Sequence, residues 1–297
     1  MQPTPHRRVL LIADDYGLSA GVSEGIRTLI ERRRLSGTSV MVTFSRWAED
    51  AHAIKPLRGQ TSIGLHLNLT VGTPMGAMPV LAPGGELPDV GRLTRLALFR
   101  SLDVGELASE ISRQLDAFEM ALGYPPDHID GHQHVHALPG VRQALMAALK
   151  ARPGLAGVLV RDPADLPLRI MKRGLQVPKA LSVAALASGF GRLAKKNGFA
   201  VNRGFSGFSD FAPDSDYQDE LCRAWLPQAL GTRHMVMCHP GYPDAELAAR
   251  DPVTVRRREE LDALLAMPEP GSHLIHIERF TGGPPLVWDD RVWQGAA

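Results

Sequence analysis

Strand-like and helix-like segments alternate along most of this 297-residue chain. The strand-like segments are short apolar runs, and the helix-like segments are longer and carry apolar residues at helical spacing. The segments that read as strands are 9–13, 39–43, 62–70, 128–136, 157–161, 234–238 and 273–277, and those that read as helices are 18–34, 104–122, 140–151, 217–229 and 254–266. Alternation over a whole domain predicts parallel βαβ units, which form either an open doubly wound sheet or a barrel.

Polar side chains with catalytic potential lie within several predicted strands or directly after them. They are Asp14, Asp15, His66, His132, Arg161 and His239. A barrel gathers all its strand ends around one mouth, whereas an open sheet would scatter these groups. The sequence therefore favours a single α/β domain over residues 1–297, folded as a (β/α) barrel. We expect the barrel to be irregular, because segment 201–208 is rich in glycine and lacks a clear strand pattern.

The composition excludes several classes of protein. With 33 basic and 32 acidic residues the net charge is +1, so no overall field attracts nucleic acid. Cys222 and Cys238 form no CxxC pair and are too few for a disulfide framework, which indicates a reducing compartment. The first apolar stretch ends at Asp14, too early for a signal peptide, and no apolar run is long enough to span a membrane. We expect a soluble cytoplasmic protein.

Asp130, His132, His134 and His136 occupy every second position of one predicted strand. In an extended strand these four side chains would share a face. A packed sheet face normally carries Val, Ile or Leu, and buried imidazoles need hydrogen-bond partners or a metal ion to offset desolvation. The row therefore predicts a metal-binding or proton-handling site, although a solvated strand edge would have the same pattern.

Three other short motifs carry candidate groups. Asp14 and Asp15 end an apolar strand, where they could be catalytic or could only stabilise the loop before Ser19, a candidate helix cap. His66 alternates with leucines among small and polar residues, which suits a lined pocket, but a hydrogen-bonded core histidine fits as well. His239 precedes a Pro-Gly turn, which leaves its imidazole displayed at the end of a strand.

Four motifs in chain order are Ile12-Ala-Asp-Asp-Tyr-Gly-Leu-Ser19, Gly64-Leu-His-Leu-Asn-Leu-Thr70, His128-Ile-Asp-Gly-His-Gln-His-Val-His136 and Cys238-His-Pro-Gly241. Together they resemble the YdjC, or ChbG/HpnK, family of carbohydrate deacetylases. The resemblance spans the chain from Val9 to about Leu265, apart from segment 166–209. It implies a (β/α) barrel of the glycoside hydrolase and deacetylase type that removes acetyl groups from N-acetylated sugars with one divalent metal ion.

The resemblance also implies a metal-ligand set. Motif by motif, Asp15, His66 and His132 take the place of the ligands. One carboxylate and two imidazoles would leave coordination positions for water and for the acetyl oxygen. These ligand types suit Zn²⁺ best, and the carboxylate with open water positions also admits Mg²⁺ or Mn²⁺.

By the same resemblance, Asp14 takes the place of the general base and His239 that of the general acid. Arg161 corresponds loosely to an arginine that stands near the base in related NodB-type enzymes. Hydrolysis of an acetamide needs an activated water, a stabilised oxyanion and a proton for the departing amine. These residues, together with a metal ion, would supply all three.

The remaining polar residues of the motifs are predicted to bind substrate. Residues on the same face of a strand are roughly 6.5–7 Å apart, which is too far for ligands of one small ion. We therefore expect His134 and His136 at the mouth of the pocket rather than on the metal. Asn68 and Asp130 are expected to line the pocket with them.

Segment 166–209 is basic and contains no acidic residue. Its cations are Arg169, Lys172, Arg173, Lys179, Arg192, Lys195, Lys196 and Arg203. Val183, Leu186, Phe190 and Leu193 fall at helical spacing within it and predict an amphipathic helical insertion. Such an insertion is either an ordinary helix with a solvated face or a lid that meets an anionic or lipid-linked substrate at a membrane surface.

The function predicted from the sequence is metal-dependent deacetylation of an N-acetylglucosamine-containing oligosaccharide or glycolipid. A homodimer is in keeping with the resemblance. Two alternatives are hydrolysis of another acyl group, such as an ester or a formamide, and a sugar-binding relative without activity. A protein that only binds sugar would need neither a base nor an acid, so Asp14 and His239 argue against the last alternative.

Overall fold

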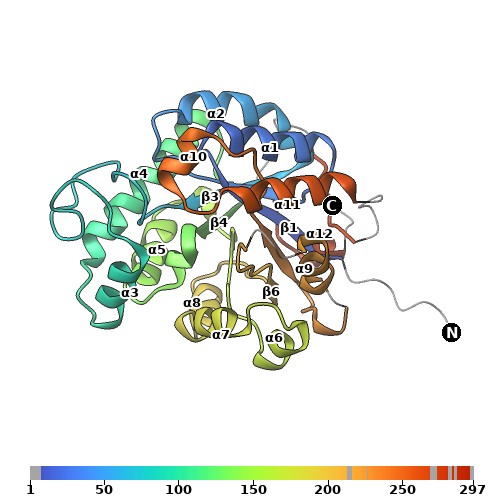
Figure 1. The fold of residues 1–297 in the computed structure, drawn as a ribbon. Helices are drawn as coiled ribbons and strands as arrows, with labels where there is room; N and C mark the ends of the chain where they lie inside the picture. Colours follow the sequence, from blue (N-terminus) through green and yellow to red (C-terminus); the bar gives the residue numbers. More distant parts are fainter. Residues whose placement is uncertain are drawn as a thin grey trace.

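A curled sheet of parallel strands forms the centre of the molecule (Figure 1). The computed structural model describes residues 8–212, 216–225, 227–267, 273–279, 283 and 286–294. Within these residues the sheet has seven strands in the order β5-β4-β3-β2-β1-β7-β6, and all neighbours run parallel. The strands are β1 (Leu10–Tyr16), β2 (Gly37–Val40), β3 (Ser62–Leu67), β4 (His128–Gly131), β5 (Leu159–Val160), β6 (Phe205–Ser206) and β7 (Met235–Cys238).

One short segment spans the gap between the two edge strands. Ala200 forms a parallel bridge with Leu159 of β5, and five residues later Phe205 of β6 pairs with Met235 of β7. The backbone N–H of Val160 donates to the Ala200 carbonyl at 2.8 Å. The chain from residue 200 to residue 206 therefore joins both edges, and the sheet curls into an irregular barrel. The predicted fold class is confirmed, and so is the irregularity of the Gly-rich segment.

Helices cover the outside of the sheet. In Figure 1, α1, α2, α10 and α11 lie on one side of the sheet, and α6, α7 and α8 lie on the opposite side. The helices are α1 (Ala20–Glu31), α2 (Trp47–Ile54), α3 (Val90–Leu98), α4 (Val104–Leu122), α5 (Val141–Lys150), α6 (Pro167–Arg173), α7 (Val177–Leu186), α8 (Phe190–Lys196), α9 (Tyr217–Ala224), α10 (Ala245–Arg250), α11 (Val255–Ala266) and α12 (Asp290–Gln294). Among the described residues, no helix is long and apolar enough to cross a membrane.

The helices begin and end where their sequences favour it. Ser19 caps α1 by accepting a hydrogen bond from the backbone of Val22 at 3.3 Å, as its position predicts. The helix α4 begins after Asp103, which accepts from the backbone of Glu106 at 2.9 Å, and ends at Gly123 with φ 83°. The apolar stripe of α4 is buried.

Alternate residues of β1 face different apolar clusters. Leu11 and Ala13 belong to the larger cluster, which the helices cover. Leu10 and Ile12 belong to the smaller cluster, together with Phe205, on the other face of the sheet. Side chains two apart on a strand share a face. The strand therefore packs apolar groups against both faces before its carboxyl end turns polar.

The predicted strand over 128–136 is wrong in its second half. β4 ends at Gly131, and a 3₁₀ turn follows over His132–Ala137. Within this turn Gln133 and His134 have φ values of 53° and 61°, in the left-handed region. The alternation of an extended strand is lost there, so His132, His134 and His136 do not share a face.

Several other boundaries also move. β3 ends at Leu67 rather than residue 70, because Asn68 accepts hydrogen bonds from the backbone N–H groups of Thr70 and Val71 at 3.1 Å and closes a turn. The segment predicted as a strand over 273–277 contributes only a single bridge, from Leu274 to Val9. The predicted helix over 217–229 ends at Ala224.

Two glycines of the four sequence motifs are required by close contacts. Gly17 has φ +92°, and a Cβ there would lie 2.6 Å from the carbonyl oxygen of Met41. A Cβ on Gly64 would lie 2.4 Å from the ring of His128. That ring is held by a hydrogen bond of 2.8 Å to Ser62 Oγ. The His128 ring therefore cannot move aside to make room for a Cβ on residue 64.

Replacing Gly64 with Ala is expected to lower the free energy of unfolding by about 1–3 kcal/mol, since the added methyl overpacks a fixed ring. Urea denaturation followed by circular dichroism would measure the change. Gly154→Ala is the control, because a Cβ at Gly154 meets nothing within 4 Å. Equal stability of the two variants would show that the His128 ring is not fixed.

Candidate metal centre and catalytic cavity

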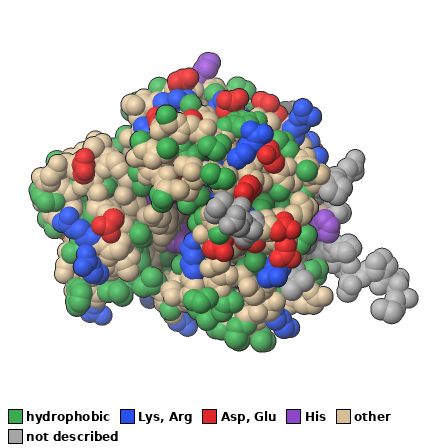
Figure 2. All heavy atoms as spheres, in the orientation of Figure 1, with side chains coloured by type: hydrophobic (Ala, Val, Ile, Leu, Met, Phe, Trp, Pro, Cys, Tyr) green, Lys and Arg blue, Asp and Glu red, His purple; other side chains and the backbone are tan. Residues whose placement is uncertain are grey.

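A cavity of about 360 Å³ lies at the carboxyl ends of the strands. Among its wall residues are Asp14, Asp15, His66, His132 and His239, which come from strands far apart in the sequence. Figure 2 shows histidine side chains in the hollow beside the α3 region, and acidic and basic side chains interspersed over the surrounding face. The barrel thus brings these five predicted residues to one place.

A bulge at the end of β1 separates the two aspartates. The pairing of β1 with β2 shifts register between Ala13 and Tyr16, and Asp15 has φ 71°. Asp14 points to Arg161, which donates to its two carboxylate oxygens at 2.6 Å each. Asp15 points instead to a pair of histidines. The irregular backbone gives the two neighbouring carboxylates different partners.

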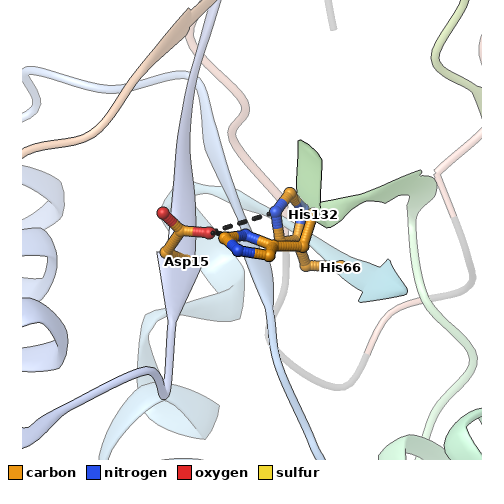
Figure 3. A group of neighbouring side chains, drawn as sticks. All are labelled: Asp15, His66 and His132. Carbon is orange, nitrogen blue, oxygen red and sulfur yellow. Dashed lines mark hydrogen bonds and ion pairs between the residues drawn. The ribbon is translucent and has the colours of Figure 1, made fainter. Parts of the chain in front are cut away.

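Asp15, His66 and His132 converge on one point (Figure 3). Asp15 Oδ1 lies 2.8 Å from His132 Nδ1 and 3.2 Å from His66 Nε2. One potential ligand atom from each residue lies within 4.8 Å of the others, and all three residues are buried. The other oxygen of Asp15 accepts a hydrogen bond of 2.7 Å from Arg257. These three residues, with the carboxylate anchored by Arg257, could hold a cation.

Asp130 is fully buried behind His66 and does not face the cavity. Its carboxylate lies 2.6 Å from His66 Nδ1 and 2.5 Å from Arg161 Nη2. The prediction that Asp130 lines the pocket is wrong. Because Asp130 is hydrogen-bonded to Nδ1 of His66, it fixes the ring so that Nε2 faces Asp15. Ser39 Oγ reinforces this position, 3.1 Å from the same Nδ1.

The buried charges shift one another's protonation. Burial would raise the pKa of the Asp15 carboxyl, but His132 and Arg257 outweigh burial and hold that pKa well below its usual range. Burial would lower the pKa of His66, but Asp130 and Asp14 outweigh it and raise that pKa to about 10. Both shifts favour the charged forms, so the electrostatic partners in this cluster dominate over desolvation.

The three histidines after Gly131 go to three different places. His132 lies at the cluster, and His134 lines the cavity with its ring packed edge-on to Phe205 and Phe208. His136 is fully buried, and its Nε2 is 2.8 Å from the carbonyl oxygen of Arg161. The prediction that His136 lines the pocket mouth is wrong, because the turn directs this side chain into the interior.

Asn68 also lies away from the cavity wall. It is buried, and its Nδ2 donates to Thr43 Oγ1 and to the carbonyl oxygen of Val71, at 2.8 Å each. With Oδ1 accepting from the loop backbone, all its polar atoms are used inside the protein. Asn68 therefore shapes the loop after β3, and the prediction that it lines the pocket is wrong.

His239 stands at the end of β7 and forms part of the cavity wall. Its backbone N–H donates to Glu260 at 2.5 Å, and its ring contacts Phe211 edge-on with 5.3 Å between centroids. Burial lowers the pKa of His239 to about 4, against the opposite effect of Asp15 and Asp14. The imidazole is consequently neutral at pH 7.

Sequence reasoning missed two residues of the cluster, Ser39 and Arg257. Arg257 is buried and donates both to Asp15 and, at 2.8 Å, to Asp251. It is the middle one of three consecutive arginines in α11, a pattern that normally indicates a solvated helix face. Ser39 is a small residue in a buried strand. Neither pattern distinguishes these residues from structural ones.

The basic segment 166–209 forms α6, α7 and α8, and two residues of α7 line the cavity. They are Lys179 and Val183. Lys179 Nζ donates to the carbonyl oxygen of Ser209 at 3.1 Å and lies 4.5 Å from the centroid of the Phe211 ring. The helix α7 thus forms one wall of the cavity, and its role as a lid stays a prediction.

The fold and the site together define the class of this protein, which is an α/β barrel with a buried Asp-His-His cluster at its strand ends. Comparison of its sequence with known families identifies the family within that class. Residues 8–268 match the family model described as YdjC-like protein, so the chain belongs to the YdjC family. This confirms the resemblance seen in the four motifs.

Two relatives are similar over most of their length. A chitooligosaccharide deacetylase of Serratia marcescens is 30% identical over 259 residues, which cover 87% of this chain and 90% of the relative. One of Klebsiella pneumoniae is 30% identical over 264 residues, covering 87% and 91%. The crystal structure of an Enterococcus faecalis protein, proposed to take part in cellobiose-phosphate cleavage, superposes with a TM-score of 0.65 at 18% identity and covers 88% of this chain and 92% of that one. This last likeness concerns the fold alone.

Replacing His66 or His132 with Ala is expected to abolish stoichiometric binding of a divalent metal, because each removes one of three ligands. His134→Ala is the matched control and should keep the metal, since His134 lines the cavity outside the cluster. Elemental analysis of the purified, folded variants would measure metal content. Full occupancy in His66→Ala would contradict the ligand set.

Proposed function

We propose that this chain is a metal-dependent deacetylase that hydrolyses the acetamide of an N-acetylated sugar in an oligosaccharide or a glycolipid. The observation that carries the proposal is the cluster of Asp15, His66 and His132 beside the separate carboxylate of Asp14. The relatives named chitooligosaccharide deacetylases, which match along most of the chain, support the reaction and the sugar substrate.

Asp15, His66 and His132 would hold the metal ion. Their donor atoms are a carboxylate oxygen, Nε2 of His66 and Nδ1 of His132, a set that suits Zn²⁺ and, with water, Mg²⁺. Bound there, the ion would polarise the acetyl carbonyl and make water a stronger nucleophile. Asp130 behind His66 gives the site the hydrogen-bonded support that metal-binding histidines usually have.

The balance of buried charge also fits a cation. Three buried carboxylates of this region, Asp14, Asp15 and Asp130, face two buried guanidinium groups, Arg161 and Arg257. Unbalanced buried charge is costly. The raised pKa of His66 makes its ring the third buried cation, and a divalent ion bound to the deprotonated ring would take over that charge.

Asp14 is the candidate general base. A carboxylate offers about four lone-pair positions. Arg161 uses one on each oxygen, and Ser39 Oγ donates to Oδ1 at 3.3 Å, so one position remains for a water molecule in the cavity. Arg161 fixes the direction of that position, because its two parallel hydrogen bonds hold the carboxylate plane.

His239 is the candidate proton donor to the amine. Since its imidazole is neutral at pH 7, the proton that it delivers must first be taken up. The proton that Asp14 removes from water is a source within the same cavity. Base and acid would therefore act in sequence on one proton, which gives a neutral amine and acetic acid, and the acid then loses its own proton to solvent.

The identity of the substrate and the assembly of the protein stay predictions. A homodimer is proposed from the resemblance to the YdjC family, and contact with a membrane surface from the basic segment 166–209. Exposed apolar side chains around α6 favour membrane contact, because Leu166, Leu168 and Met171 are 57%, 62% and 56% exposed beside Lys172. Hydrolysis of an ester or a formamide would use the same groups.

Asp14→Asn is expected to lower kcat for acetate release by about a hundredfold or more, the contribution of a positioned base, and to leave metal binding intact. Asp15→Asn should weaken metal binding itself. The measurements are acetate release from short N-acetylglucosamine oligomers and from a lipid-linked N-acetylglucosamine, together with metal content. Equal metal loss in both variants would show that the two aspartates do not divide the roles of base and ligand. Faster cleavage of O-acetyl esters than of amides would favour the alternative reaction.

A further inference from the structure

A second, apolar pocket of about 140 Å³ adjoins the catalytic cavity. The two share four wall residues, which are Val90, Gln133, His134 and Val183. Beyond them the pocket is lined by Thr94, Ala137, Leu138, Pro163, Leu186 and Ala187. Thr94 is the one residue of these six with a polar side chain. A sugar ring would find few partners for its hydroxyl groups there, so the pocket suits a hydrocarbon group.

Another groove beside the cavity has the opposite character. It measures about 560 Å³ and shares Val71 and Arg250 with the cavity wall. Its other polar wall residues are Thr43, Ser45, Thr70, Thr73 and Glu86. The Thr70 hydroxyl is buried without a hydrogen-bond partner among the described residues. Sugar hydroxyls can be satisfied in this groove, which leaves the apolar pocket for a different part of the substrate.

The strand order places the apolar pocket across the barrel mouth from His239. His239 follows β7, whereas Gln133, Leu138 and Pro163 follow β4 and β5. In the order β5-β4-β3-β2-β1-β7-β6, three strands separate β4 from β7. On the proposed function, the nitrogen of the amide faces His239. The acyl substituent on the same carbonyl carbon then points away from His239, toward β4 and the apolar pocket.

We propose that this pocket receives the acyl chain of the substrate, so that the protein also hydrolyses N-acyl sugars whose chains are longer than acetyl, such as propionyl and butyryl. The reaction is the same hydrolysis. Water adds to the carbonyl carbon and the C–N bond breaks, one proton of the water passes to the amine nitrogen, and the acyl group leaves as a carboxylic acid that loses its remaining proton to solvent. An acetyl methyl ends at the entrance, whereas a butyryl chain extends past His134 and Val183 into the pocket. The inference rests on the proposed function and specifies the acyl group it accepts.

The test compares the N-acetyl, N-propionyl and N-butyryl forms of one amino-sugar disaccharide as substrates of the full-length, metal-loaded protein. Each buried methylene can contribute about fourfold to binding in the transition state. We therefore expect kcat/KM for the butyryl substrate to equal or exceed that for the acetyl substrate. A butyryl value clearly below the acetyl value, with acetate release intact, would overturn this inference alone. Absence of release from every substrate would overturn the proposed function as well.

Two variants locate the effect. Leu186→Trp and, independently, Thr94→Trp fill the pocket from α7 and from α3, and each should lower the ratio of butyryl to acetyl kcat/KM at least tenfold. Leu98→Trp, on the same helix as Thr94 and 58% exposed, is the control and should keep the wild-type ratio. An unchanged ratio in both filled variants would overturn the proposal. The proposal would also be overturned if the filled variants lost kcat/KM selectively for N-acetylated substrates that carry an alkyl group at the reducing end. The pocket would then hold that alkyl group rather than the acyl chain.

Discussion

Arg161 ties the barrel interior to the site, and most of the geometry of the site depends on it. The guanidinium is fully buried and bonded to Asp14 of β1 and Asp130 of β4, with contacts of 2.5–2.6 Å, while its backbone carbonyl contacts His136. Three strand ends are thereby held at fixed separations. Removing one partner from such a buried ion pair costs roughly 3–5 kcal/mol, because it leaves an uncompensated charge. A substitution of Arg161 would therefore affect the stability of the fold and the geometry of the site together.

The effect of Arg161 reaches the candidate metal ligands through Asp130. Arg161 fixes Asp130, Asp130 fixes the ring of His66, and the free nitrogen of that ring then faces Asp15. From the other side, Arg257 holds the second oxygen of Asp15. The cluster is thus preorganised by hydrogen bonds that do not involve a metal ion. Preorganisation of this kind lowers the reorganisation needed when an ion or a substrate binds.

The sequence predicted the barrel and the gathering of Asp14, Asp15 and His66, because apolar strands that end in polar groups have that consequence in any (β/α) barrel. It could not predict the turn at Gln133 and His134. Neither residue is a glycine or an asparagine, the types that most often adopt left-handed backbone. The prediction of an extended strand therefore placed His132, His134 and His136 on one face, whereas the turn separates them. Arg257 was missed for a different reason, because burial of one arginine among three depends on tertiary packing.

The groups for the reaction and the groups around the substrate come from different parts of the chain. Asp14, His66 and His239 stand on the strands or at their ends, where the sheet fixes them. The outer walls come from helices, with Val90 at the start of α3 and Val183 on α7. The basic segment that contains α7 is also the part of the chain outside the resemblance to the YdjC motifs. Changes in α7 can reshape the walls without disturbing the Arg161 network, so substitutions in this segment can change the accepted substrate while the reaction stays the same.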